Sequence, residues 1–377
     1  MTRYWHIWLF VIFASALIAG CRDKGEEAPS PTSQPEENGL PQPVPASQPE
    51  KTGLLLPSVS IACNPLIGGD QTGGGFYSVP VGKEGVYEIW TWREGTVVRS
   101  NAFARPKNVF NITIVQDEKY LGHGFRKGVN DAILVLNSFK TGEVVKEWKP
   151  PDGWEFQSIE AGMSSNGKFA AVVLAAKPTS DPDETERYRV GRIDLKTETL
   201  AWNGELSGNG AATIRRIAVS DDGRYIAVGG WNNGVALVDA SAKKVLWSGR
   251  SPTEVSTGYV RFSSDGLTLY TAGSEGCVYT VDTITGRGRG RLWATDTGRS
   301  LYGHRISSLA ISPDGRWLAA GTGPQGRVYL WDITSSAPKP RTLPHGGSTV
   351  FIVEFSPDSQ RLASVANGTI KIWNVRN

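Results

Sequence analysis

The chain has 377 residues, of which 39% are hydrophobic and 20% are charged, with 40 Lys and Arg against 37 Asp and Glu. This balance is typical of a soluble globular protein and excludes both disorder throughout the chain and a polytopic membrane protein. A net charge of +3 gives no electrostatic reason to expect nucleic acid as a partner. The 3 Cys and 4 His leave little material for a disulfide framework or a zinc site, so we expect no metal.

The chain starts with the features of an export signal. Arg3 precedes an apolar run from Tyr4 to Ala19, about 16 residues, which is shorter than the roughly 20 needed to cross a bilayer core. The run ends in Leu17-Ile18-Ala19-Gly20-Cys21, which resembles a bacterial lipobox. The resemblance implies a lipoprotein signal peptide over residues 1–20 and a diacylglyceryl group on the thiol of Cys21, which would anchor the protein to a membrane.

The residues after Cys21 indicate where the anchored protein goes. Arg22 stands where an Asp, by the sorting rule for such lipoproteins, would favour inner-membrane retention. The resemblance therefore implies export to the periplasmic side of an outer membrane if one is present, and otherwise to the outer face of the plasma membrane. Residues 21–52 are rich in Pro and poor in large apolar side chains, so we predict a disordered tether.

Residues 53–377 repeat themselves, and one marker of the repeat is a turn sequence. It consists of an apolar residue, Ser, any residue, Asp or Asn, and then Gly, which is Ser in the last copy. Pro or Ser with Asp-Gly is typical of a tight turn between two strands, so each copy predicts a hairpin. The copies are Met163–Gly167, Val219–Gly223, Phe262–Gly266, Ile311–Gly315 and Phe355–Ser359.

Two further markers recur with the same period. Alternating strands end at Thr91, Asn137, Asp194, Asp239, Asp282, Asp332 and Asn374. These seven ends lie about 47 residues apart on average, slightly above the 40 to 45 residues of a four-stranded propeller blade. After four of the ends a Trp follows, as an outermost strand would place it; these are Trp148, Trp202, Trp247 and Trp293.

The later repeats resemble the WD40 family. Ser312-Pro313-Asp314-Gly315 leads to Leu330-Trp331-Asp332, Phe355 to Asn374 follows the same pattern, and Gly303-His304 and His345 occupy the family's Gly-His position. The resemblance implies an all-β fold, a seven-bladed β-propeller over residues 53–377. Each blade has two apolar faces, for instance Val328 and Leu330 against Tyr329 and Trp331, so neighbouring blades must stack and the ring must close.

Closure of the ring requires one more strand. The last repeat stops after its third strand, near Val375, so its fourth strand must come from elsewhere in the chain. We predict that Leu54-Leu55-Leu56 supplies it, and that Val59 to Cys63 forms the first strand of the first blade.

The WD40 resemblance also implies a buried hydrogen-bond relay. In that family a His at the Gly-His position bonds through a strand Ser or Thr to a turn Asp, and a strand Trp completes the relay. In this chain the matching residues are His345, Ser364, Asn367 and Trp373, with Asn in the place of the Asp. We expect a structural role for these residues.

Two glycine-rich segments imitate nucleotide-binding loops. Gly162 to Lys168 has the spacing of a phosphate-binding loop, but Phe169 stands where Ser or Thr would hold magnesium, and the segment is the turn of the third repeat. Gly321 to Gly326 matches a dinucleotide fingerprint, but Pro324 interrupts it and a strand follows. We therefore expect no cofactor and no small-molecule substrate.

Two insertions and two cysteines depart from the repeat. Lys177 to Arg187 lengthens a turn on the rim that carries the Gly-His loops, and Gly286 to Arg291 belongs to the opposite rim. Its three Arg fit an anionic partner or lipid headgroups, but a solvated loop is the simpler interpretation. Cys63 and Cys277 fall in the first and fifth repeats, too far apart for a bridge, and we interpret both as buried apolar residues.

Together these features predict a membrane-tethered, extracytoplasmic scaffold that binds protein partners and has no catalytic residues. Interfaces favour Trp, Tyr and Arg as anchors, so the partner-binding candidates are Trp154, Trp231, Tyr259 and Arg305. Two alternatives remain open, a subunit of an outer-membrane or envelope assembly complex and an enzyme with its site in the central funnel.

Overall fold

The structure is a computed structural model, and the residues it describes belong to one compact unit, Lys51–Asn377. They are residues 59–62, 66–69, 75–78, 86–94, 96–104, 109–115, 119–125, 132–138, 140–156, 161–176, 187–207, 214–230, 234–250, 257–294, 305–323 and 325–376. The predicted signal peptide, Cys21 and the predicted tether lie outside these residues. Among the described residues no helix is long and apolar enough to span a bilayer.

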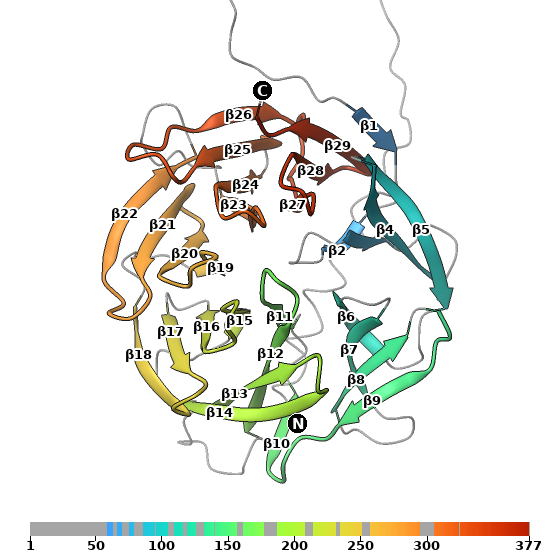
Figure 1. The fold of residues 1–377 in the computed structure, drawn as a ribbon, viewed down its shortest axis with the longest axis vertical. Helices are drawn as coiled ribbons and strands as arrows, with labels where there is room; N and C mark the ends of the chain where they lie inside the picture. The colour runs from blue at the N-terminus through green and yellow to red at the C-terminus, as the bar shows by residue number, and fades with distance from the viewer. Residues whose placement is uncertain are drawn as a thin grey trace, which may run out of the picture. The chain divides into compact units, whose positions relative to one another are not determined.

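Every regular element in these ranges is a β-strand, and the strands form seven antiparallel sheets (Figure 1). Sheet 1 contains β2 (Leu66–Gly69), β3 (Gly75–Ser78), β4 (Val86–Arg93) and β5 (Thr96–Ala104). Sheet 2 contains β6 (Val109–Val115), β7 (Lys119–Phe125), β8 (Ala132–Ser138) and β9 (Val144–Trp148). Sheet 3 contains β10 (Trp154–Phe156), β11 (Gly162–Met163), β12 (Phe169–Ala176), β13 (Arg187–Asp194) and β14 (Thr199–Ser207).

The later sheets follow the same plan. Sheet 4 contains β15 (Ile214–Val219), β16 (Tyr225–Gly230), β17 (Gly234–Asp239) and β18 (Lys244–Arg250). Sheet 5 contains β19 (Thr257–Phe262), β20 (Thr268–Gly273), β21 (Cys277–Asp282) and β22 (Gly288–Trp293). Sheet 6 contains β23 (Ile306–Ile311), β24 (Trp317–Thr322), β25 (Arg327–Asp332) and β26 (Arg341–Pro344). Sheet 7 contains β27 (Ile352–Phe355), β28 (Arg361–Ala366), β29 (Thr369–Asn374) and, from the start of the described chain, β1 (Val59–Ala62).

The sheets stack around a common centre. Each sheet contacts the next one along the chain, and β27 of sheet 7 contacts β2 of sheet 1, which returns the circuit to its start (Figure 1). The predicted two-faced packing is confirmed in sheet 6. Val328 and Leu330 pack in a cluster with sheet 7, whereas Tyr329 and Trp331 pack in a cluster with sheet 5. The fold is therefore all-β and arranged like a propeller.

The predicted hairpins are confirmed at all five turn markers, and one hydrogen-bond pattern explains them. In each copy the Ser hydroxyl donates to the Asp or Asn carboxyl or amide oxygen two residues later, at 2.5 to 2.9 Å. The same hydroxyl accepts from the backbone N–H five residues later, at 2.9 to 3.0 Å. The last position has positive φ in every copy, which favours Gly there and makes Ser359 the exception.

The other two sequence markers, the strand-end residues and the Trp residues that follow them, can be compared with the observed strands. Strands β13, β17, β21, β25 and β29 end at the predicted Asp or Asn, while β4 and β8 continue beyond Thr91 and Asn137. The four marker Trp residues lie on the outermost strands β9, β14, β18 and β22, as predicted.

Ring closure uses a different segment from the predicted one. Val59–Ala62, assigned from the sequence to the first blade, pairs antiparallel with β29 and supplies the outermost strand of sheet 7. Sheet 1 begins instead at Leu66. Leu54 to Leu56 lie outside the described residues. The prediction was wrong because two apolar segments follow one another before the first repeat, and periodicity does not distinguish them.

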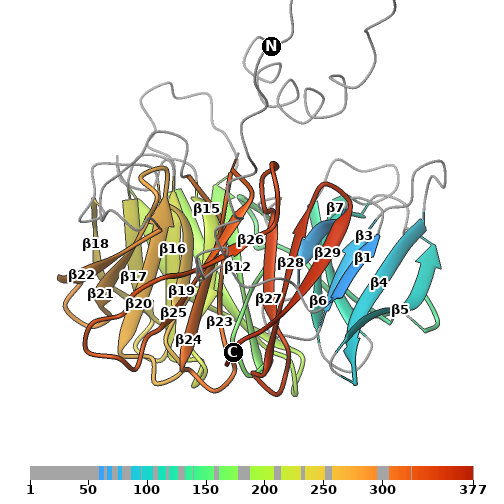
Figure 2. The ribbon, with the colours of Figure 1, turned by 90° about the horizontal axis from the view of Figure 1, so that it is seen from above.

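The antiparallel order gives the ring two different rims (Figure 2). One rim, which we call the turn rim, carries two turns of each sheet. These are the turn between its first and second strands and the turn between its third and fourth strands. The connections between second and third strands, and those between successive sheets, open on the opposite rim, which we call the loop rim.

Candidate interaction surface

The structure brings three of the four predicted relay residues together. His345 Nδ1 lies 2.7 Å from Ser364 Oγ, and the indole N–H of Trp373 donates to the same oxygen at 2.7 Å. Asn367 lies outside this chain of bonds, because it is exposed in the turn between β28 and β29 with φ of 45°. Asn367 is found in the turn because Asn adopts the left-handed backbone conformation more readily than most residues.

The relay is buried and therefore structural. His345 is 5% exposed, and Ser364 and Trp373 are also buried. Burial lowers the pKa of His345 to about 4, and the nearby cation of Lys371, whose ammonium group donates to the His345 carbonyl oxygen at 2.6 Å, acts in the same direction. The imidazole is thus neutral at pH 7 and braces sheet 7 from within.

The four predicted partner-binding residues have different environments. Trp154 is 5% exposed, and the guanidinium of Arg189 lies 4.2 Å from the centre of its ring while also pairing with Glu205. The side chain of Trp154 therefore packs within sheet 3 and is not presented to a partner. Trp231 lies outside the described residues. Arg305 is exposed at the start of β23, on the loop rim.

Tyr259 belongs to a row of contacts that joins the inner strands of four successive sheets. The guanidinium of Arg216 in sheet 4 lies 5.1 Å from the centre of the Tyr259 ring in sheet 5. The Tyr259 hydroxyl donates to the Ser307 carbonyl oxygen of sheet 6 at 2.5 Å, and the Ser307 hydroxyl donates to the Val350 carbonyl oxygen at 2.7 Å. Tyr259 is half-buried and its hydroxyl is engaged, so it stiffens the rim.

An exposed aromatic residue on the same rim was not predicted from the sequence. Phe351 is 61% exposed immediately before β27. It lies close to Arg305, because the Gly323 N–H donates to the Arg305 carbonyl oxygen and the Val350 N–H donates to the Thr322 carbonyl oxygen. The repeat itself contains a usable signal. Five residues before the turn Ser, sheet 7 has Phe351 where sheets 5 and 6 have Gly258 and Ser307.

The glycines that imitate a dinucleotide fingerprint serve close packing between sheets 6 and 7. A Cβ atom at Gly321 would lie 2.8 Å from the Val350 side chain, and one at Gly323 would lie 2.6 Å from the Thr349 hydroxyl. Both distances are shorter than ordinary Cβ contacts, so a side chain at either position would force its neighbour to shift. The segment therefore brings the loop before β27 against the loop after β24.

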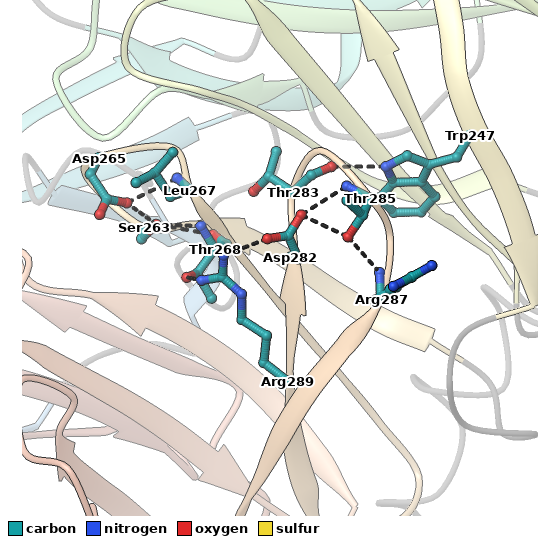
Figure 3. Close-up of polar contacts among 10 residues, drawn as sticks. All are labelled: Trp247, Ser263, Asp265, Leu267, Thr268, Asp282, Thr283, Thr285, Arg287 and Arg289. Atoms are coloured by element: carbon teal, nitrogen blue, oxygen red, sulfur yellow. Dashed lines mark hydrogen bonds and ion pairs between the residues drawn. The ribbon is translucent and has the colours of Figure 1, made fainter.

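The Gly-Arg insertion is an edge strand for most of its length, which corrects the predicted loop. Gly288 to Trp293 form β22 on the outside of sheet 5. Arg289 pairs with Asp282 at 2.5 Å, and Arg291 lies over the rings of Tyr279 and Trp293 (Figure 3 shows the Arg289 contact). The strand ending at Asp282 is the third one, as predicted, and Leu292-Trp293 belongs to the fourth.

The described ranges contain one cysteine, Cys277. Cys277 is buried, and burial raises the pKa of its thiol to about 12, so the thiolate is absent at neutral pH. Cys63 lies outside the described residues. In the parts of the chain that the structure describes, no three His, Cys, Asp or Glu side chains are grouped as metal ligands.

Comparison with known proteins identifies the repeat. The family model "WD domain, G-beta repeat" matches residues 203–239, 296–332 and 339–374. Three segments of the chain therefore match the WD40 repeat. The matched segments end at Asp239, Asp332 and Asn374, which are the ends of the third strands of sheets 4, 6 and 7.

Several curated proteins are similar over part of their length. An uncharacterized WD repeat-containing protein of Synechocystis is 28% identical over 157 residues, 41% of this chain and 42% of that protein. The LST8 homolog of Drosophila melanogaster is 26% identical over 42% of this chain and 51% of its own. The small ribosomal subunit protein RACK1 of Caenorhabditis elegans is 31% identical over 24% and 26%. The chain thus spans about half or less of the relatives it matches.

One solved structure is similar across nearly the whole chain. A chain in the crystal structure of a mitotic checkpoint complex superposes with a TM-score of 0.60, covering 92% of this chain and 99% of that one. At 16% sequence identity this likeness shows the fold alone. The ring of sheets therefore also occurs in a solved structure of low sequence identity.

Proposed function

We propose that this protein is a lipid-anchored, extracytoplasmic, seven-bladed WD40-like propeller that acts as a non-catalytic scaffold for protein partners. The observation that carries the proposal is the closed circuit of seven stacked sheets within the described residues, combined with matches to WD40 repeats. WD40 repeat proteins generally mediate protein–protein interaction. Two similar proteins have names that place them in larger assemblies, a target of rapamycin complex subunit of Arabidopsis thaliana and the small ribosomal subunit protein RACK1.

The loop rim is the surface that we assign to the partner. Phe351 and Arg305 are exposed there and flank the same backbone segment, Thr322-Gly323. Aromatic and Arg side chains are favoured anchors because they bury large areas and, for Arg, offer several donors at once. The row of contacts from Arg216 to Val350 holds this rim in place, which lowers the entropy lost on binding.

The proposal of a membrane anchor is based on the N-terminal residues of the chain. The apolar run before Cys21 and the Pro-rich segment after it support a lipidated N-terminus joined to the propeller by a flexible link. Stable anchoring requires two or more acyl chains, which the diacylglyceryl group on Cys21 would supply.

Crosslinking in cells tests the scaffold role. A photoreactive amino acid is placed at position 305 or 351, and at position 339 as a matched control, since Lys339 is exposed outside the loop rim. We expect a discrete crosslinked protein from positions 305 and 351 but not from 339, and weaker capture after Phe351→Ala or Arg305→Ala. Equal crosslinking at all three positions would remove the loop rim as the partner surface.

Labelling with an alkyne analogue of palmitate tests the anchor separately. We expect the wild-type chain to be labelled and to sediment with membranes. The Cys21→Ser variant should lose the label and, if exported, appear in the soluble envelope fraction. A variant that is still labelled would place the lipid elsewhere.

A further inference from the structure

One ion pair of the repeat is made differently in sheet 5. In sheets 4 and 6, an Arg directly after the marker turn pairs with the Asp that ends the third strand; Arg224 lies 3.2 Å from Asp239 and Arg316 lies 2.7 Å from Asp332. In sheet 5 the equivalent position is Leu267. The Asp at the strand end, Asp282, pairs instead with Arg289, which reaches it from the outer strand β22 (Figure 3).

The exchange leaves two aliphatic side chains exposed on neighbouring turns. Leu267 is 56% exposed and Ile284 is 49% exposed. Their turns are joined directly, because the Thr283 N–H donates to the Leu267 carbonyl oxygen at 3.1 Å. In sheet 6 the same two positions hold Arg316 and Thr334, so the fold itself accepts polar residues at both. The pair therefore does little for the packing of sheet 5.

Two carboxylates, Asp265 and Asp282, and two guanidinium groups, Arg287 and Arg289, lie near the pair, so the local charge is balanced. The Asp265 carboxylate accepts from the Ser263 hydroxyl and the Leu267 N–H, and Asp282 accepts from Thr285 and Arg289 (Figure 3). By contrast, Arg287 is exposed, and among the described residues its guanidinium makes no ion pair. Aliphatic side chains beside one exposed cation without an ion pair suit a surface that is apolar below and anionic at its face, which is the structure of a lipid interface.

The start of the described chain is oriented toward the same rim. Strand β1 runs from Val59, opposite Ile372, to Ala62, opposite Thr369. Strand β29 ends at Asn374 on the turn rim, so the chain enters β1 from the turn-rim side. The sequence between Cys21 and Val59 has a root-mean-square reach of about 30 Å as a flexible coil.

We propose that the turn rim of sheet 5 rests on an anionic lipid surface. Leu267 and Ile284 enter the headgroup region, and Arg287 contacts lipid phosphates. The proposal rests on the lipid anchor of the proposed function, because two aliphatic side chains bind weakly alone and need the high local concentration that a tether provides. This orientation turns the loop rim, with Phe351 and Arg305, away from the membrane and toward partners.

The test replaces the natural anchor, so that it does not depend on lipidation in cells. The chain from Arg22 onward carries an N-terminal polyhistidine tag and is bound to nickel-chelating vesicles rich in phosphatidylglycerol. Hydrogen exchange is then followed in the turn 283–287 and in the matched turn 333–337 of sheet 6. We expect exchange of the sheet 5 turn to slow by about threefold or more on these vesicles and much less on vesicles of phosphatidylcholine alone.

Two variants supply matched controls from the protein's own repeat. Leu267→Arg and Ile284→Thr introduce the residues that sheet 6 holds at these positions, and each should remove most of the protection without unfolding the chain. Arg287→Gln should weaken protection only on the anionic vesicles. Equal exchange of the turn on vesicles and in solution would overturn the proposal, as would protection that appears only when a captured protein partner is present. Failure of the anchor itself would be seen separately in the Cys21→Ser labelling experiment.

Discussion

Trp247 donates its indole N–H to the Thr283 carbonyl oxygen at 2.8 Å and thereby joins the outer strand of sheet 4 to a turn of sheet 5 (Figure 3). The ring of Trp247 also covers Gly286, where a Cβ atom would lie 2.9 Å from it. Thr283 is fully buried, so its carbonyl oxygen depends on this donor or on another partner within the protein. The bond is a polar link between two neighbouring sheets at their outer edge.

The first prediction concerns this link. Trp247→Phe keeps most of the ring but removes the donor, and should lower the free energy of unfolding by about 1 kcal/mol, whereas Trp247→Ala should cost about 3 kcal/mol. Urea unfolding followed by circular dichroism measures both. Trp293→Phe, on the equivalent strand of sheet 5, is the control and should change stability less. An equal loss in the two Phe variants would contradict the role of the bond.

A second prediction concerns the glycine of the marker turn. Gly223 has φ of 70°, and a Cβ atom there would lie 2.8 Å from the Phe169 ring of sheet 3. Gly223→Ala combines backbone strain with this clash and should cost roughly 2 to 4 kcal/mol. Gly142→Ala is the matched control: its φ is 72° but its Cβ meets nothing within 4 Å, so only about 1 kcal/mol is expected. Similar losses in urea unfolding would show that the contact is relieved by movement.

A third prediction follows from the lowered pKa of His345. Because the folded-state pKa is about 4, below the ordinary value of 6.5, the unfolded chain takes up the proton first as the pH falls. Stability is therefore fully present above about pH 6.5 and decreases toward pH 4, by about 2 kcal/mol between pH 7 and pH 5 from this residue. His345→Gln should be less stable at pH 7 but should lose less stability over that interval. Parallel pH profiles for the two proteins would contradict the assignment.

A fourth prediction concerns the carboxylate that sheet 5 pairs differently. The pKa of Asp282 is lowered to about 2 by the Thr285 backbone N–H and by Arg289. Arg289→Gln should raise this pKa part of the way back, since the Thr285 bonds remain. Adding Leu267→Arg should lower it again, because residue 267 stands where Arg224 and Arg316 make the pair in sheets 4 and 6. Carboxyl-carbon NMR titration measures each step, and an unchanged value in Arg289→Gln would exclude the ion pair.

A fifth prediction concerns closure of the ring. A chain that begins at residue 58 keeps β1, and a chain that begins at residue 64 loses it. We expect the shorter chain to be less stable by about 3 kcal/mol, because sheet 7 loses a paired strand and β29 becomes an open edge. Thermal unfolding of the two chains measures the difference. If both melt together, the β1–β29 pairing does not hold the ring.

The sequence predicted those residues of the candidate site whose role depends only on their position in the repeat. His345, Ser364 and Trp373 were predicted from the resemblance to the WD40 family, which implies a relay at those positions of the repeat. Asn367, predicted to belong to the relay, is exposed, and Trp154, predicted to bind a partner, is buried, because burial of a side chain depends on which strands pack against it. Trp154 is covered by Arg189, which is far along the chain. Phe351 was not predicted, although aligning the repeats places it five residues before the turn Ser, where sheets 5 and 6 have Gly258 and Ser307.

The sequence by itself determined the local geometry of the repeat. Ser, Asp and Gly within six residues form their own hydrogen bonds, so each hairpin is specified by short-range chemistry that any copy carries. Only the tertiary structure decided that Val59–Ala62 closes sheet 7. It also decided that Arg289 pairs with Asp282, a role that in sheets 4 and 6 belongs to the Arg at the position of Leu267. The β1–β29 pairing joins segments that are far apart in the chain, and in the Arg289–Asp282 ion pair an outer-strand residue takes the role of the residue after the turn. In both cases the folded chain adopts the arrangement that pairs the most backbone groups and charges.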